Sequence, residues 1–278
     1  MSQDGQVQTV RGPVAAVGLG QVLMHEHVFV LTADVQQNFP DEWGDEDERV
    51  ADAVRRLREL PEHGVSTIVD VTVIGQGRNI PRIKRIADQV PGVNIVVATG
   101  VYTFDAVPLF FWQRPRETMT EFFVRDITEG IAGTGVKAGM LKCAVDEKGL
   151  TEGVERVLRS VARAHVATGG TPITIHTHAA GQHGPAIVAV LREEGVDFSR
   201  VVLGHSGDAV NNPGYLAEMA DTGKDHRHVV FISGGNHFRI AHRSARLNGR
   251  RRASLGRSRK AIRERKKCVA ANCAPVQR

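Results

Sequence analysis

The sequence has few cysteines and no long apolar run. Its three cysteines, Cys143, Cys268 and Cys273, form neither a disulfide framework nor a metal-binding knuckle. No apolar run approaches the roughly 20 residues that a membrane-spanning helix needs. The N-terminal stretch MSQDGQVQTVRGP is polar and lacks the hydrophobic centre of a secretory signal. These absences predict a cytoplasmic protein without a membrane partner.

The net charge of +5 hides an uneven distribution along the chain. Residues 224–278 hold 16 of the 36 basic residues and two of the 31 acidic ones, a net charge of +14. The remaining 223 residues hold 20 basic and 29 acidic residues, a net charge of −9. A basic surface for an acidic partner such as nucleic acid would therefore belong to the tail alone.

The first 223 residues alternate short apolar runs with longer amphipathic stretches. The runs are rich in β-branched residues and nearly continuous, as in strands that are covered on both faces. The stretches 45–64, 150–170 and 183–197 have helical periodicity and end at glycines. Six β-then-α units predict a parallel sheet with right-handed crossovers. The apolar runs are VLMHEHVFV (22–30), VSTIVDV (65–71), VNIVVATG (93–100), AGMLKCA (138–144), TPITIHTH (171–178) and RVVLGHS (200–206).

Periodicity alone leaves two folds open, a (β/α)8 barrel of the TIM type and an open doubly wound sheet. Five of the runs carry His or Lys inside or at the C-terminal end, which favours a barrel that builds one site from many strands. A complete barrel needs about 250 residues. Since the pattern fails after Gly223, we expect residues 1–223 to form a barrel that is incomplete after about six units.

Histidines recur at the predicted strand ends. Alternate residues of a strand share a face, so His25 and His27 should point the same way. His176 and His178 form a second such pair, and His205 ends a third strand. Each histidine alone reads as well as a core or surface residue, but together on three strand ends they indicate ligands for a zinc-type ion.

Lys142 lies inside a strand that should be fully buried. Burying an ammonium is costly, so a buried lysine tends to lose its proton. A neutral amine near metal ions can react with carbon dioxide to form a carbamate, whose two oxygens can bridge two cations roughly 3.5–4 Å apart. The alternative is a lysine that reaches solvent at the strand end or pairs with a carboxylate.

Residues 9–29, TVRGPVAAVGLGQVLMHEHVF, resemble the opening segment of the phosphotriesterase-like family of the amidohydrolase superfamily. The motifs LKCA, ITIHTHA and VVLGHSGD occur in the order and approximate spacing of that family. The resemblance extends from about Val7 to Gly223.

This resemblance implies a binuclear metal centre on a distorted (β/α)8 barrel, with two divalent ions, most often zinc. His25 and His27 would bind the more buried ion, and carbamylated Lys142 would bridge both. His176 and His205 would bind the more exposed ion.

Two further residues take roles by resemblance. Tyr102, at the end of a predicted strand, is similar to the tyrosine of lactonase-like members that helps to hold the attacking hydroxide or the substrate carbonyl. Ordinary packing is the alternative for Tyr102. His178 lies two positions beyond a ligand and would support the site from behind or simply pack.

The family supplies its acid–base carboxylate from an aspartate at the end of strand eight, which we do not find. Asp208 lies in the loop after the sixth predicted strand, and Asp225 precedes any further strand. The tail from Lys224 is either a genuine basic extension or the out-of-frame translation of a GC-rich gene. The loss of periodicity, motifs and charge balance at one point favours the second account.

The sequence therefore predicts a metal-dependent hydrolase that acts on lactones, with side activity on organophosphate triesters. The enzyme would be a homodimer. An amidase acting on acylated amino compounds uses the same chemistry. A catalytically silent metal-binding barrel and a nucleic-acid binder acting through the basic tail are alternatives from other classes.

Translation of codons 215–278 in all three frames tests the origin of the tail. We expect another frame to encode a Ser-His-Asp motif and two more β/α units, because a shifted frame changes periodicity and charge at one point. The measurement is resequencing of the gene across these codons. Confirmation of the written frame, with no such units in the others, would leave a genuine basic tail.

Overall fold

The computed structural model describes residues 5–209, 212, 214, 215 and 219, together with two short strands at 230–232 and 238–240. The tail from Lys224 otherwise lies outside the described residues. None of the described helices combines the length and the apolar character needed to cross a lipid bilayer.

A curved sheet of parallel strands forms the centre of the molecule. Each of the six apolar runs contains one strand, and each strand pairs in parallel with the next one along the chain. Sequential parallel order is the arrangement of a β/α barrel, so the prediction of a partial barrel is confirmed. The strands are β3 (Gln21–Glu26), β4 (Val65–Asp70), β5 (Asn94–Gly100), β6 (Met140–Val145), β7 (Ile173–Thr177) and β8 (Val201–Gly204).

Two further strands extend the sheet beyond β8. The run HVVFIS contains β9 (Val230–Ile232), which pairs in parallel with β8. The next strand, β10 (Phe238–Ile240), returns antiparallel to β9. Among the described strands no pairing joins β10 to β3, so this part of the sheet is open.

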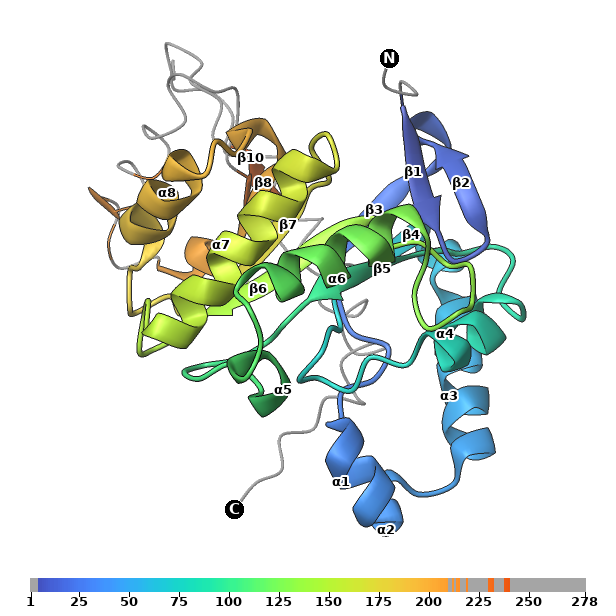
Figure 1. Cartoon of the computed structure of the whole chain (residues 1–278). Helices are drawn as coiled ribbons and strands as arrows, with labels where there is room; N and C mark the ends of the chain where they lie inside the picture. Colours follow the sequence, from blue (N-terminus) through green and yellow to red (C-terminus); the bar gives the residue numbers. More distant parts are fainter. Residues whose placement is uncertain are drawn as a thin grey trace, which may run out of the picture.

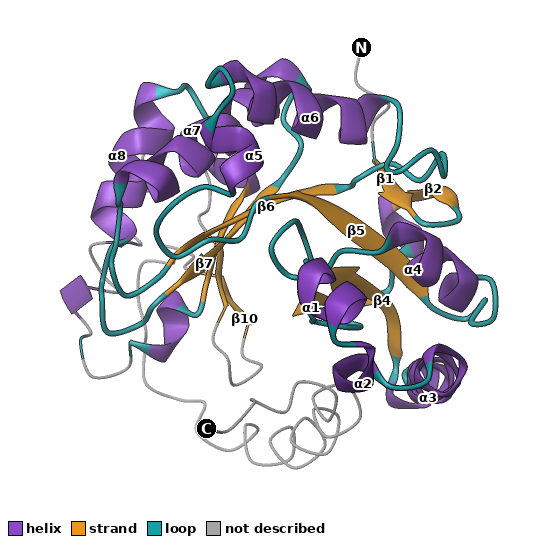
Figure 2. Cartoon of the chain, turned by 60° about the horizontal axis from the view of Figure 1, so that its bottom comes forward, coloured by secondary structure: helices purple, strands orange, loops and turns teal. Residues whose placement is uncertain are grey.

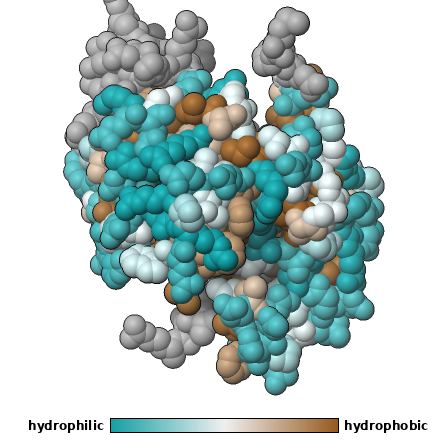
Figure 3. Space-filling model, in the orientation of Figure 1, coloured by the Kyte–Doolittle hydropathy of each residue, from teal (hydrophilic) through white to brown (hydrophobic). Residues whose placement is uncertain are grey.

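Helices cover the outside of the sheet (Figures 1 and 2). The side chains of Asp45 and Thr151 accept hydrogen bonds from backbone N–H groups three residues on, which caps α3 and α7 at their first turns. Figure 3 shows a mainly hydrophilic face with scattered apolar residues, as expected where amphipathic helices turn their polar sides to water. The longer helices are α3 (Glu46–Glu59), α4 (Ile80–Ala87), α6 (Glu117–Thr128), α7 (Glu152–Ala167) and α8 (Gly184–Glu193), and the short ones are α1 (Ala33–Asn38), α2 (Pro40–Trp43) and α5 (Leu109–Trp112).

An N-terminal hairpin precedes the sheet and packs beside β5. Its strands, β1 (Gln6–Thr9) and β2 (Gly12–Ala15), are antiparallel, and the N–H of Val10 donates to Ile95 O at 2.8 Å. The guanidinium of Arg11 in the hairpin turn donates to Ala87 O at 2.7 Å and Val93 O at 2.8 Å. Arg11 thereby satisfies carbonyl groups at and beyond the C-terminal end of α4.

Alternation along the strands separates the helix-covered side of the sheet from the barrel interior. In β6, Leu141 and Cys143 belong to the hydrophobic cluster under α6, α7 and α8. Met140 lies on the other side of β6 and packs with Val71 and Ala98 in the interior. Because side chains alternate with a period of two, Lys142 also points into the interior.

Gly100 allows β5 to approach β6 closely beside Lys142. Its φ of 146° lies in a region that favours glycine, and a Cβ atom there would overlap the carbonyl oxygen of Lys142. The two residues are direct partners across the ladder. Any side chain at this position would push the two strands apart.

We expect Gly100→Ala to lower the free energy of unfolding by roughly 2–5 kcal/mol, from backbone strain and overpacking together. Gly133→Ala is the matched control, since Gly133 also has positive φ (68°) but no atom within 4 Å of a built Cβ. It should cost about 1 kcal/mol. Urea unfolding measures both, and equal losses would show that the contact with Lys142 does not matter.

Candidate metal centre

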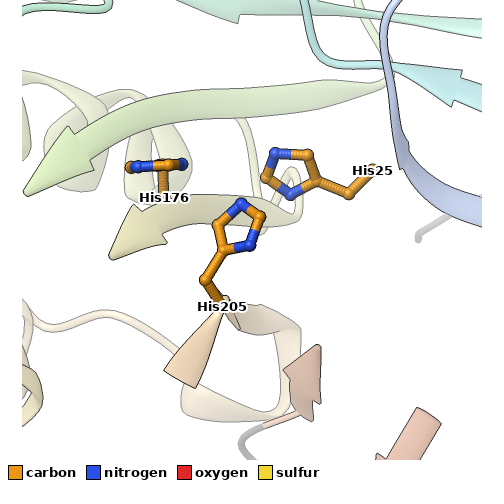
Figure 4. A group of neighbouring side chains, drawn as sticks. All are labelled: His25, His176 and His205. Atoms are coloured by element: carbon orange, nitrogen blue, oxygen red, sulfur yellow. The ribbon is translucent and has the colours of Figure 1, made fainter. Parts of the chain in front are cut away.

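The predicted site residues gather at the carboxyl ends of the parallel strands, where barrel enzymes place their chemistry. His25 lies in β3, Lys142 in β6 and His176 in β7, and His205 directly follows β8. The imidazoles of His25, His176 and His205 point toward one another in Figure 4. The interpretation of these residues as one cluster therefore agrees with their placement.

Three of the histidines are close enough to share one ligand. One ring nitrogen each from His25, His176 and His205 lies within 4.8 Å of the others. The ring centroids of His176 and His205 are 4.6 Å apart, and those of His25 and His205 are 5.1 Å apart. His205 reaches the cluster from a left-handed backbone conformation, with φ of 64°.

Lys142 forms the floor of the cluster. Its side chain is 0% exposed, and its Nζ lies 3.0 Å from Nε2 of His25. Burial lowers the pKa of Lys142 to about 7, because the charged form loses its hydration. A large fraction of the amine is therefore neutral near pH 7, so the prediction of a buried strand lysine holds and neither alternative for it is found.

The imidazoles of His25, His27 and His176 are neutral as well. Burial, and then repulsion by Lys142, lowers the pKa of His27 to about 3 and that of His176 to about 4. The same causes lower the pKa of His25 further. Nδ1 of His25 is buried and has no hydrogen-bond partner among the described residues. Neutral imidazoles with an unpartnered nitrogen, beside a neutral amine, fit a zinc-type cation.

His27 lies one residue past the end of β3 rather than inside the strand. The ladder between β3 and β4 is irregular between Leu23 and Glu26, which changes the local direction of the chain. The ring of His27 lies 5.9 Å from that of His25, beside the group of three. Its Nδ1 is 2.8 Å from Oγ1 of Thr72.

Asp146 contacts the cluster from the end of β6. Its Oδ2 lies 2.8 Å from Nε2 of His176. A carboxylate accepts, so Nε2 of His176 donates and Nδ1 carries the lone pair. Sequence reasoning missed Asp146, although its position directly after the strand of Lys142 was a usable signal.

Tyr102 follows β5 and lies beside the cluster. Its ring centroid is 5.5 Å from that of His176 and 5.1 Å from that of the half-exposed Phe104. Burial, and then the charge of Asp146, raises the pKa of Tyr102, so its hydroxyl stays protonated and can donate a hydrogen bond. Tyr102 also packs against the interior apolar cluster of Val71 and Ala98, so its role in the site stays a prediction.

The remaining residues that the sequence singled out, His178, Asp208 and Asp225, are not part of the group of three histidines. Nδ1 of His178 is buried without a hydrogen-bond partner in the described part of the chain. Asp208 closes a short turn after β8, as expected of a loop residue, and its Oδ2 lies 3.7 Å from Nδ1 of His205. Asp225 lies outside the described residues.

Comparison with known proteins agrees with the resemblance seen in the motifs. A "Phosphotriesterase homology protein" of Mycobacterium tuberculosis is 55% identical over 225 residues, which are 78% of this chain and 68% of that protein. An aryldialkylphosphatase of Saccharolobus solfataricus is 38% identical over 205 residues, 74% of this chain and 64% of that protein. The chain thus spans about two thirds of the length of these relatives.

A solved structure shares the fold. The structure of the phosphotriesterase from Mycobacterium tuberculosis matches with a TM-score of 0.75 and 52% identity, over 81% of this chain and 69% of that one. The model of the phosphotriesterase family matches residues 5–231. The chain therefore belongs to the phosphotriesterase family.

Proposed function

We propose that this site is the binuclear metal centre of a hydrolase that acts on lactones, with side activity on organophosphate triesters. The observation that supports it is the group of three imidazoles beside a fully buried lysine amine, with Nζ 3.0 Å from Nε2 of His25. His25, His27, His176 and His205 would hold two divalent ions, most simply zinc.

Lys142 would supply the bridging anion. Its neutral amine would attack the carbon of carbon dioxide: an N–C bond forms, one C–O π bond breaks with its electron pair moving to oxygen, and one N–H proton leaves to solvent. The resulting carbamate is anionic and offers two oxygen ligands from the floor of the site. When bound, the two ions would lower the pKa of a water and polarise the carbonyl or phosphoryl oxygen under attack.

Tyr102 and Asp146 would arrange the rest of the site. The protonated hydroxyl of Tyr102 can donate to a substrate oxygen, and Asp146 keeps the lone pair of His176 on Nδ1. Tyr102 is the residue that favours a lactone, because it is similar to the tyrosine of lactonase-like members of the family. The homodimer stays a prediction.

A silent metal-binding protein is the second candidate. One observation favours it. The two described carboxylates beside the cluster are already engaged with candidate ligands, because Asp146 contacts His176 and Asp208 contacts His205. An acid–base group would then have to come from beyond the described residues. Metal content and turnover, measured together, separate the two candidates.

We expect the chain to bind two equivalents of zinc and to hydrolyse γ- and δ-lactones. Lys142→Met should weaken metal binding by at least about 100-fold and abolish turnover, since the bridging anion is lost. His63→Asn, at an exposed histidine just before the N-terminal end of β4, is the control and should change neither. Elemental analysis and lactone titration are the measurements. Two tightly bound metals without turnover would support the silent protein, and full binding by Lys142→Met would contradict the proposal.

The buried amine also predicts how stability depends on pH. The pKa of Lys142 is lowered from 10.5 to about 7, so between these values the unfolded chain binds a proton that the folded chain does not. Stability must then rise with pH, by about 1.3 kcal/mol per unit between pH 8 and 9.5. Lys142→Met should lack this slope. Urea unfolding in buffer free of metal and carbon dioxide measures the difference, and parallel slopes would mean that Lys142 stays charged.

A further inference from the structure

We propose that Thr72 is a positioning residue for His27: held by Asp70, it fixes the imidazole as the Nδ1–H tautomer, with the lone pair on Nε2. The inference rests on the proposed function only in naming a cation as the group that this lone pair would bind. It concerns two residues at the end of β4 that the sequence motifs did not single out.

The geometry places one hydroxyl among three neighbours. Oγ1 of Thr72 lies 2.6 Å from Oδ1 of Asp70, 2.8 Å from Nδ1 of His27 and 3.4 Å from the carbonyl oxygen of Phe29. Thr72 and Asp70 are both buried. The backbone N–H of Thr72 also donates to Oδ1 of Asp70, at 3.1 Å.

Counting hydrogens assigns the donors. A hydroxyl has one hydrogen, and neither an ionised carboxylate nor a carbonyl can donate. The Thr72 hydrogen therefore goes to Asp70, its shortest contact. The remaining contact, with His27, is satisfied only if Nδ1 carries the hydrogen and the threonine oxygen accepts it.

This assignment also fixes the second nitrogen of His27. A neutral imidazole carries one N–H, so Nε2 of His27 has the lone pair. None of the described residues makes a hydrogen bond to that nitrogen. In a solvated imidazole the two tautomers interconvert freely, and here a buried hydroxyl removes the choice.

An outer hydrogen bond also fixes the tautomer of His176, but with the hydrogen on the other ring nitrogen. Its Nε2 donates to Asp146, which leaves the lone pair on Nδ1. Two imidazoles from different strands are thus set by different outer partners, with the neutral Thr72 hydroxyl behind one and a carboxylate behind the other. Such outer hydrogen bonds orient ligands and raise their basicity.

Thr72, which contacts His27, and Asp70, which holds Thr72, come from one short segment. Asp70 ends β4, and Thr72 lies two residues later on the same side of the chain. The N–H of Val28 also contributes a hydrogen bond to Asp70, so the carboxylate ties the segment after β3 to the end of β4. The tautomer is therefore set by the packing of neighbouring strands.

The test uses the full chain, free of metal at pH 8 and labelled with ¹⁵N at histidine. We expect His27 to show a protonated Nδ1 and an unprotonated Nε2, with the signal assigned by its loss in His27→Asn. Thr72→Val removes the hydroxyl at nearly constant shape and should abolish this single tautomer. Thr72→Ser keeps the hydroxyl and should restore it.

Zinc affinity gives the second readout. Thr72→Val should weaken binding by about 10–100-fold, and Thr72→Ser should stay within a few-fold of the parent chain. If His27 of the parent chain carries its hydrogen on Nε2, the inference is wrong. This measurement does not depend on whether any variant folds. The inference is also wrong if the parent chain, Thr72→Val and Thr72→Ser all show the same His27 tautomer and the same zinc affinity. The expected tautomers in a parent chain that binds no zinc would support the inference and reject the proposed function.

Discussion

The placement of the Lys142 amine away from water is the constraint on which the site depends. An ammonium at this depth would lose its hydration without forming an ion pair with any carboxylate of the described residues, so burial favours the neutral form. The approach of β5 through Gly100 closes the space behind the backbone of Lys142, and His25 lies 3.0 Å from its amine. Burial also lowers the pKa values of His25, His27 and His176, and repulsion between members of the cluster lowers them further. A group of neutral nitrogen donors is the result.

Parallel order explains how residues far apart in sequence meet. Because every strand from β3 to β8 runs in the same direction, the carboxyl ends of all six strands lie at one edge of the sheet, called the rim here. The ligand candidates come from the ends of β3, β6, β7 and β8, and the residues behind them come from the ends of β4 and β6. The same strand ends thus supply both the donors and the groups that orient them. A shift of one residue in any of these ladders would turn its donor to the helix-covered side.

Much of this could be predicted from sequence, and the limits have physical causes. Apolar runs located the six strands, and helical periodicity located α3, α7 and α8, whereas α4 and α6 were not predicted. Histidines at strand ends pointed to the cluster because they are rare inside apolar runs. The position of His27 beyond β3 could not be predicted, because it depends on an irregular ladder that leaves no sequence pattern. Thr72 looks like an ordinary loop residue until its contacts with His27 and Asp70 are known.

The sheet beyond β8 bears on the acid–base group. A parallel return after β9 needs a crossover of about a dozen residues, but only residues 233–237 separate β9 from β10. The antiparallel return of β10 is therefore forced by chain length, and at this point the described strands leave the barrel order. The described rim can supply nitrogen donors for cations from β3 to β8, whereas its nearest carboxylates already contact His176 and His205. Holding metal and managing the proton are thus separable demands on this chain. The first would be met by strands whose order is that of a barrel, and the second would need a group that the described strand ends do not supply.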